Sequence, residues 1–285
     1  MGKFDKDSLG DRMKDYEAVY KQKAMPKMPI VIRIDGKAFH TFTKGMHKPF
    51  DDLLMDAMQR TMISLCSELQ GAVFGYVQSD EITIVSKLAD IRKSEMLYDG
   101  KVQKILSITP SKATKYFNKY FFENVEKLER NPEAFKNHVD ISVYKKKLFE
   151  AEFDTRMMSI PDFDVINNLI WRQQDAVRNS ISAMAHSMFT TKELHGKNCS
   201  DMMDMMIERG QNWNDLPTYK KRGTCCYKVE EGIRSKWKLD LDMPILTEDR
   251  NFFESKFNPE SLDEKLENMP KTETNNEENI KKEER

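Results

Sequence analysis

The sequence predicts an α/β protein of the α+β kind, in which an antiparallel sheet packs against helices. Residues 28–34 alternate between apolar side chains on one side and mixed side chains on the other, as a half-buried strand does. Residues 51–70 carry apolar side chains at helical spacing, and Asp51 stands where an N-cap is expected. Two short strand-like runs follow, at 72–77 and 82–85, so the order is strand, helix, strand, turn and strand.

Acidic side chains stand where these strands end. Asp35 closes the first strand beside Gly36, which leaves the backbone free to turn, and Asp80 lies in the turn 78–81 between the next two strands. A right-handed crossover through the helix would bring Asp35 and Asp80 to one edge of the sheet. Close carboxylates suit Mg²⁺, and two such ions serve phosphoryl transfer. The pair therefore predicts a two-metal site for nucleotidyl transfer.

Each acidic turn also has an ordinary structural explanation. Asp-Gly is a common turn dipeptide, and Ser-Asp-Glu between strands is typical of a solvated hairpin. Taken together, and each at the end of a strand, the two turns favour the metal site.

Composition limits the class of protein. The chain has 285 residues, 39% of them hydrophobic, which is enough for a buried core. Its formal net charge of −1 gives no global basic field, so a nucleic-acid surface would have to be local. The four cysteines have no Cys-x-x-Cys spacing, and no signal-peptide-like or membrane-spanning stretch is present, so a reducing cytoplasm is expected and a membrane is not.

By composition we divide the chain into residues 1–140, 141–257 and 258–285. The last part is rich in Glu, Lys, Asn and Thr and is expected to be a disordered charged tail. The middle part is expected to be mostly helical and irregular, with a long helix over residues 168–189. In the first part, helical spacing runs through residues 94–130, and Pro110 leaves both two helices and one kinked helix open.

Five motifs, in chain order, resemble those of the tRNA-histidine guanylyltransferase superfamily. They are VIRIDGKAFH at 31–40, KP at 48–49, YVQSDE at 76–81, WRQQDA at 171–176 and LPTYKKRGT at 216–224. The resemblance implies a palm-type catalytic domain over 1–140 and an RNA-supporting region over 141–257. It also implies 3′-to-5′ addition of nucleotides to the 5′ end of a tRNA. In that family ATP activates the 5′-monophosphate, the 3′-hydroxyl of a nucleoside triphosphate attacks it, and pyrophosphate is finally released.

The resemblance further implies the ligands and the catalytic residues. Two Mg²⁺ ions, ATP, GTP or another nucleoside triphosphate, and tRNA are the expected ligands, and a homotetramer is the expected assembly. Asp35, the Gly36 carbonyl and Asp80 would hold the metal ions. Glu81 completes the catalytic set with Asp35 and Asp80, and with Ser79 it would orient a metal ligand or the triphosphate.

Residues around these carboxylates would bind the nucleotide. The set implied by the resemblance is Gly36, Lys37, Ala38, Phe39, His40, Asp51, Ser79, Lys101 and Lys104. The loop 37–40 would wrap the triphosphate, with backbone N–H groups on phosphate and the two rings near the base or sugar. Structural alternatives stay open: His40 taken alone fits a structural residue, Asp51 fits a helix cap, and Lys101 and Lys104 fit a solvated helix face.

RNA binding would need local positive charge. The candidates are Lys145, Lys146, Lys147, Arg172, Arg178, Lys220, Lys221 and Arg222. Each of these clusters could equally be plain surface. Trp171, on the same predicted helix as Arg172, fits a core position better than a stacking platform.

The chain departs from the family pattern in one informative place. Eukaryotic guanylyltransferases carry His-Ile-Asn-Asn after the Trp-Arg-Gln segment, whereas this chain reads Val-Arg-Asn-Ser at 177–180. That difference favours the guanylyltransferase-like branch, which repairs truncated tRNA 5′ ends by templated addition, over non-templated G addition to tRNA-histidine. Phe50 also replaces the usual Asn after Lys48-Pro49. A palm-type cyclase and a non-catalytic tRNA-binding protein are the remaining alternatives.

Overall fold

A six-stranded antiparallel sheet forms the centre of the molecule. The computed structural model describes residues 8–134, 140–231 and 234–258, and within these residues the strand order is β4-β1-β3-β2-β5-β6. The predicted α+β class is confirmed. The strands are β1 Ile30–Gly36, β2 Ala72–Gln78, β3 Glu81–Ser86, β4 Phe153–Ser159, β5 Thr224–Glu231 and β6 Arg234–Asp240.

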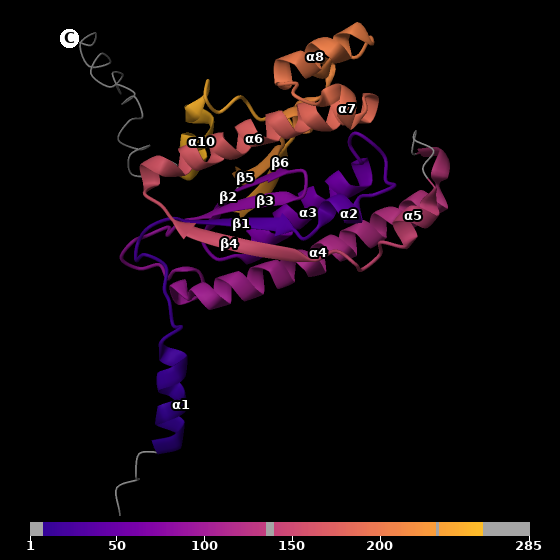
Figure 1. Cartoon of the computed structure of the whole chain (residues 1–285). Helices are drawn as coiled ribbons and strands as arrows, with labels where there is room; N and C mark the ends of the chain where they lie inside the picture. Colours follow the sequence, from indigo (N-terminus) through magenta and orange to yellow (C-terminus); the bar gives the residue numbers. More distant parts are fainter. Residues whose placement is uncertain (1–7, 135–139, 232–233, 259–285) are drawn as a thin grey trace, which may run out of the picture.

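The helices form a layer on each face of this sheet (Figure 1). The longer helices are α3 and α4 on one face and α6 on the other. Two separate buried clusters agree with this, since one contains residues of α3 and α4 and the other residues of α6 and α10. The described helices are α1 Ser8–Ala18, α2 Phe39–Phe42, α3 Asp52–Glu68, α4 Val102–Arg130, α5 Ile141–Lys145, α6 Asp162–Met188, α7 Thr191–Leu194, α8 Cys199–Glu208, α9 Thr218–Arg222 and α10 Arg250–Phe257. Short 3₁₀ turns lie at Leu97–Gly100, Pro132–Ala134 and Trp213–Asp215.

The alternation read from residues 28–34 sets the register of β1. Ile30, Ile32 and Ile34 are buried against α3 and α4, whereas Val31 is buried in the core on the α6 side. β1 pairs antiparallel with β3, so the first strand does lie beside the hairpin, as predicted. Because a shift of one residue would exchange the two faces, the apolar pattern specifies which side chains turn toward each helix layer.

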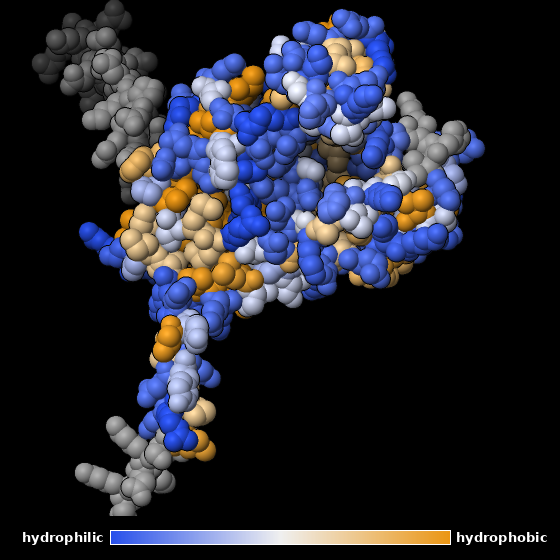
Figure 2. Space-filling view, in the orientation of Figure 1, coloured by the Kyte–Doolittle hydropathy of each residue, from blue (hydrophilic) through white to orange (hydrophobic). Residues whose placement is uncertain are grey.

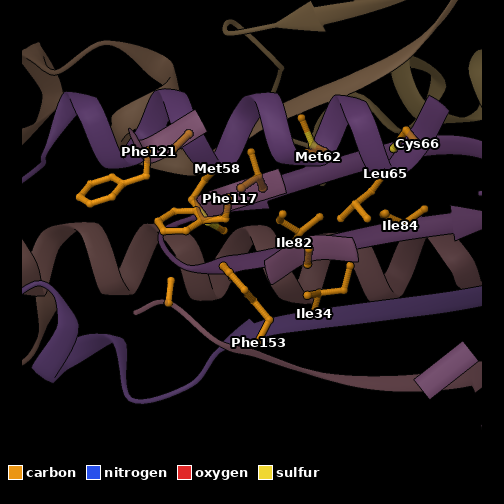
Figure 3. Packing of buried hydrophobic residues seen from close by; sticks show 14 of the residues in the cluster. Ile34, Met58, Met62, Leu65, Cys66, Ile82, Ile84, Phe117, Phe121 and Phe153 are labelled. Atoms are coloured by element: carbon orange, nitrogen blue, oxygen red, sulfur yellow. The ribbon is translucent and has the colours of Figure 1, made fainter. Parts of the chain in front are cut away.

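The core under α3 and α4 is dense in aromatic and aliphatic side chains. Figure 3 shows Met58, Met62 and Leu65 of α3 lying over Ile82 and Ile84 of β3. Three phenylalanine rings lie in the same cluster, those of Phe117, Phe121 and Phe153. Each fully buried side chain of this size contributes about 1.5–3 kcal/mol relative to exposure. This packing makes the α3–α4 face of the sheet a rigid support.

The C-terminal half differs from its prediction. The sequence predicts a mostly helical and irregular region over 141–257, but this region also supplies β4, β5 and β6 to the same sheet as β1 to β3. β4 enters at the edge beside β1, and β5 joins β2. β4 was missed because its apolar side chains are few and partly exposed. β5 is buried over residues 224–227, but this stretch is short and adjoins charged residues. The two regions therefore share one sheet.

Two further predictions concern the helices and the tail. Residues 102–130 form one continuous helix with Pro110 inside it, which decides between the two alternatives for that segment. The predicted tail lies outside the described residues except for Asn258, which follows α10. Among the helices that the structure describes, none combines the length and apolar character that spanning a membrane requires.

Candidate active site

The end of β1 and the β2–β3 turn are joined by a backbone hydrogen bond. Gly36 N–H donates to the Asp80 carbonyl at 3.0 Å, and Asp35 lies opposite Glu81 in the β1–β3 ladder. The structure therefore brings Asp35, Asp80 and Glu81 to one end of the sheet, as the sequence predicts. Gly36 is required here for space, because a Cβ at this position would lie 2.4 Å from the Phe39 ring.

The ionised form of the Asp80 carboxyl group is disfavoured by its surroundings. Burial raises the pKa of Asp80 above its usual value, and the nearby charge of Asp35 raises this pKa further. The Asp80 backbone, a hydrogen bond from Ser79 and the charge of His40 act in the opposite direction without cancelling the rise. Ser79 adopts φ +50° in the turn, which holds its side chain beside Asp80. The surroundings of Asp80 thus lack the positive charge that its ionised form needs.

The oxygens at this position suit a hard divalent cation. Asp35 and Asp80 supply carboxylates and Gly36 a backbone carbonyl, which are oxygen ligands of the kind that Mg²⁺ binds. The raised pKa of Asp80 is consistent with a cation-binding site, because a bound cation would stabilise the ionised carboxylate. No group of three or more His, Cys, Asp and Glu side chains suited to a metal occurs among the described residues. A cation here would therefore have to complete its coordination with phosphate and water, as Mg²⁺ commonly does.

Glu81 is held in a buried ion pair. Arg172 Nε donates to Glu81 Oε1 at 2.7 Å, and the same guanidinium donates through Nη2 to Asp175 at 2.7 Å. Both residues of the Glu81–Arg172 pair are nearly inaccessible, at 7% and 6% exposure. Burial raises the pKa of Glu81, while Arg172 and Arg33 lower it. Glu81 is thus a residue that holds α6 against β3, and its contacts do not favour the predicted role in catalysis.

The same contacts correct the prediction that Arg172 binds RNA phosphates. Its guanidinium is buried and divided between two carboxylates, so it has little capacity left for an external phosphate. Arg178 on the same helix is exposed and pairs with Asp175 at 3.0 Å. Asn179 also donates to Asp175, so a network on α6 surrounds this carboxylate.

The loop after Gly36 separates into a buried and an exposed part. Phe39 is 3% exposed and packs against the rings of Phe42, Phe117 and Phe153, so it belongs to the core and does not lie beside a nucleotide as predicted. Lys37, Ala38 and His40 are exposed. Ala38 has φ +54°, and this left-handed residue starts the short helix α2 and leaves the Lys37–His40 side free for a ligand. Lys37 Nζ pairs with Glu152 at 2.6 Å.

Asp51 caps helix α3, which was the structural alternative to its predicted role in nucleotide binding. Its side chain caps α3 by accepting from the Leu53 and Leu54 N–H groups, both at 3.0 Å. It also accepts from the Tyr144 hydroxyl and the His47 N–H. With these four donors, the carboxylate is fully used inside the protein, although it lines the cavity described below.

Lys101 and Lys104 lie far from the carboxylates. Lys101 starts α4 and pairs with Asp99, and this end of the helix lies near the beginning of the chain, where Ala24 N–H donates to Gly100. Phe117 of the same helix contacts Phe39, next to the site. At 1.5 Å per residue, Lys104 lies about 20 Å back along the helix axis. The prediction that Lys101 and Lys104 bind this nucleotide is therefore wrong for a site within one chain.

A cavity opens beside the carboxylates, between the β2–β3 turn, α6 and the start of α3. About 600 Å³ of empty space lies within its outline, a figure that includes open solvent, so the cavity is an open hollow in the surface. Ser79 lines it on the carboxylate side, and Asn179 and Ser180 line it on α6. Lys220 and Lys221 from α9 complete a polar side. Of the β2–β3 turn, Ser79 lines this cavity and Asp80 follows it in the chain, so a ligand in the cavity would lie next to the turn that carries Asp80.

The remaining predicted RNA contacts are mostly held by partners in the protein. Lys220 pairs with Asp52 at 2.8 Å, Lys221 donates to the Asn214 carbonyl, and Arg222 donates to the Met243 carbonyl. Lys145 pairs with Glu129, and Lys147 donates to the Thr41 carbonyl. Lys146 is exposed beside Lys147 and lines, with Lys37 and Ala38, a cleft next to α2.

Sequence reasoning missed two features of the site. Asp154 of β4 lies directly opposite Asp35, because β4 extends the sheet past β1, and it pairs loosely with Arg156 at 3.9 Å. No sequence signal identified β4, so this neighbour could not be found. Trp171, predicted as core, is 47% exposed, and its ring lies over the guanidinium of Arg172.

Comparison with known proteins shows what this chain is similar to. A sequence model of the tRNAHis guanylyltransferase family matches residues 10–161. Over 238 residues the chain is 31% identical to an uncharacterized protein of Acanthamoeba polyphaga mimivirus, covering 77% of each chain.

Two solved structures are similar to the whole described fold. One is a bacterial tRNA(His) guanylyltransferase (Thg1)-like protein in complex with ATP, with a TM-score of 0.74 and 40% identity. The other is a bacterial protein of the same description in complex with GTP, with a TM-score of 0.70 and 38% identity. Each match covers 88% of this chain and 99% of the other.

Replacing Arg172 with methionine should lower the free energy of unfolding by about 3–5 kcal/mol, because Glu81 is then left buried without its partner. Urea denaturation followed by circular dichroism measures the loss. In the double variant Glu81→Met, Arg172→Met the loss should be smaller, since neither member of this pair is left buried without the other. Equal losses in the single and double variants would contradict the assigned role of the pair.

Replacing Asp80 with asparagine should raise the free energy of unfolding at neutral pH without divalent cations. The pKa of Asp80 is raised in the folded protein, so its ionisation costs stability as the pH rises through that pKa. The advantage of the variant should shrink as the pH falls toward 3.8, the ordinary value, and each unit of elevation corresponds to about 1.4 kcal/mol. Urea denaturation from acidic to neutral pH measures it. Asp204→Asn on α8, an exposed position, is the control, and a variant less stable at every pH would refute the assignment.

Proposed function

Because the chain belongs to the tRNAHis guanylyltransferase family, we propose that it adds nucleotides in the 3′-to-5′ direction to the 5′ end of tRNA, and that a template strand directs the addition. The observation that carries the proposal is the pair Asp35 and Asp80 at the end of the sheet, next to an open cavity that Ser79 lines. Similar solved structures contain ATP and GTP, which supports a nucleoside triphosphate as the ligand.

The site residues divide the work of such a reaction. Asp35, Asp80 and the Gly36 carbonyl would hold Mg²⁺, which when bound neutralises the triphosphate and activates the attacking hydroxyl. The exposed residues Lys37, Ala38 and His40 of the loop would contact phosphate. Lys37 forms an ion pair with Glu152, which a phosphate group would compete for. Ser79 would orient Asp80 and face the nucleotide in the cavity. The Glu81–Arg172 pair would position β3 against α6 without touching the substrate.

Templated repair is favoured over non-templated G addition by residues on α6. The family's His-Ile-Asn-Asn stretch is replaced at 177–180, and of this segment Asn179 and Ser180 line the cavity. The polar groups at this wall therefore differ from those of the eukaryotic enzymes. The similarity to bacterial guanylyltransferase-like proteins supports the same choice.

The decisive experiment uses 5′-monophosphorylated tRNA that lacks its first nucleotide, in four versions that differ in the base opposite the gap. With ATP, Mg²⁺ and each nucleoside triphosphate, the added base should follow the opposite base. Asp35→Asn and Asp80→Asn should each lower the rate at least about 100-fold, because even outer partners of metal ligands contribute 10- to 100-fold. Asp204→Asn should retain the full rate.

Other outcomes would replace the proposal. Addition of G to intact tRNA-histidine alone would indicate the non-templated activity. A cyclic product from GTP without RNA would indicate a cyclase, and RNA binding without nucleotide consumption would indicate a binding protein. Independently of activity, Mg²⁺ should raise the melting temperature of the wild-type protein more than that of Asp80→Asn, since the variant lacks one carboxylate ligand.

Assembly as a homotetramer is part of the same proposal. The described helix α1 projects from the body of the molecule, and Leu9, Met13 and Tyr16 on one of its faces are exposed (Figures 1 and 2). A second copy could cover this face. Light scattering should give a mass of four chains, and Leu9→Glu with Tyr16→Glu should reduce it. An unchanged mass in the double variant would separate α1 from the assembly.

A further inference from the structure

Trp171 exposes its ring beside the carboxylates. It is 47% exposed, although tryptophan side chains are highly buried on average. The ring lies over two guanidinium groups, that of Arg172 at 4.3 Å from its centroid and that of Arg33 at 5.6 Å. The exposed ring of Trp171 is therefore held by two cation–π contacts, unlike a core side chain that happens to lie at the surface.

The support of the ring is rigid. Arg172 donates hydrogen bonds to Glu81 and Asp175, and these two contacts fix the position of its guanidinium under α6. Arg33 rises from β1 with 16% of its side chain exposed, and its Nε is 3.9 Å from Glu81. That Nε is buried and has no hydrogen-bond partner in the part of the chain that the structure describes. Arg33 therefore makes one long ion pair, and its guanidinium keeps positive charge close to the ring of Trp171.

The position of Trp171 relates it to the reacting groups. Arg33 and Asp35 are two residues apart on β1 and share a face of the sheet, about 7 Å from each other. Asp35 is paired with Glu81, the partner of Arg172. Trp171 therefore lies over the middle of β1, two residues along the strand from Asp35.

The nucleotide cavity lies on the other side of the carboxylates. It is lined by the β2–β3 turn and by Ala176 and Asn179 of α6, together with Gly223 at the start of β5. On an α-helix, residues 171 and 176 point in directions roughly 140° apart, and residue 179 lies more than two turns beyond residue 171, about 12 Å along the axis. The cavity and Trp171 thus flank Asp35 and Asp80, one toward β5 and the other toward β1.

We propose that Trp171 is a stacking platform for a nucleobase at the 5′ end of the RNA substrate and that it positions this end beside Asp35 and Asp80. The inference rests on the proposed function, because that reaction needs a nucleotide and an RNA end at the carboxylates at the same time. The cavity serves the nucleotide, which leaves the Trp171 side for the RNA. Stacking suits a repair enzyme because every base has a π-face, so one ring accepts many RNA sequences. The two guanidinium groups hold the ring in place, and the stacking itself supplies the contact with the RNA.

The test measures binding without catalysis. Fluorescence anisotropy with labelled 5′-monophosphorylated tRNA gives the RNA affinity, and a fluorescent ATP analogue gives the nucleotide affinity. Trp171→Leu should weaken RNA binding about 5- to 150-fold, as the removal of one base stack does, and leave nucleotide binding unchanged. Trp171→Phe should retain most of the RNA affinity. Phe163→Leu, at another exposed aromatic of α6 with 76% exposure, is the matched control and should change neither.

A second arm identifies the base involved. A tRNA whose 5′-terminal nucleotide is abasic should bind the wild-type protein as weakly as intact tRNA binds Trp171→Leu, and combining the two changes should weaken binding little further. Additive losses, or an unchanged RNA affinity in Trp171→Leu with its fold intact by circular dichroism, would overturn the inference. Loss of nucleotide affinity instead would assign the ring to the nucleotide base. If wild-type protein extends truncated tRNA while Trp171→Leu binds RNA normally, only this inference fails, whereas absence of extension by the wild type would refute the proposed function.

Discussion

The buried ion pair between Glu81 and Arg172 determines how the sheet and α6 meet. Two charges removed from water are stable only when hydrogen bonds satisfy them, and here the guanidinium is divided between Glu81 and Asp175. Asp175 is held in turn by Arg178 and Asn179 of the same helix. The rotation of α6 is thereby linked to β3, so the helix presents one side to the nucleotide cavity and another to the end of β1.

The same pair distinguishes the acidic residues that gather at this end of the sheet. Glu81 and Asp154 have arginine partners, tight for the first and loose for the second. Asp35 and Asp80 form no ion pair with a residue in the described ranges, and burial with mutual repulsion raises the pKa of Asp80. A protein that needed these two carboxylates only for its fold would be expected to neutralise them. Their lack of positive partners is the physical reason to regard them as ligands for an external cation.

The sequence predicted the parts that follow from local patterns. Alternation gave the face of each side chain in β1, and the cap at Asp51 gave the start of α3. It could not predict contacts made by distant segments. The Tyr144 hydroxyl donates a hydrogen bond to Asp51 from 93 positions along the chain, and Phe39 turns into the core because Gly36 lets its ring approach. Lys101, which the resemblance assigned to the nucleotide site, lies at the far end of α4. Residue types near a motif indicate chemistry, whereas their use depends on what the fold places against them.

The charges of the molecule bear on how it can hold RNA. Most of the lysines and arginines that the sequence singled out as phosphate contacts are engaged within the protein, as Lys220 with Asp52 and Lys145 with Glu129 illustrate. Cations that are engaged within the protein release fewer counterions when RNA binds, so these candidates contribute less to RNA affinity than free cations would. Affinity for an RNA end then has to come to a larger extent from contacts that are not ionic. An exposed tryptophan supported by two arginines is such a contact, and its place beside Asp35 joins binding to position: the surface that retains the RNA also brings its end to the carboxylates.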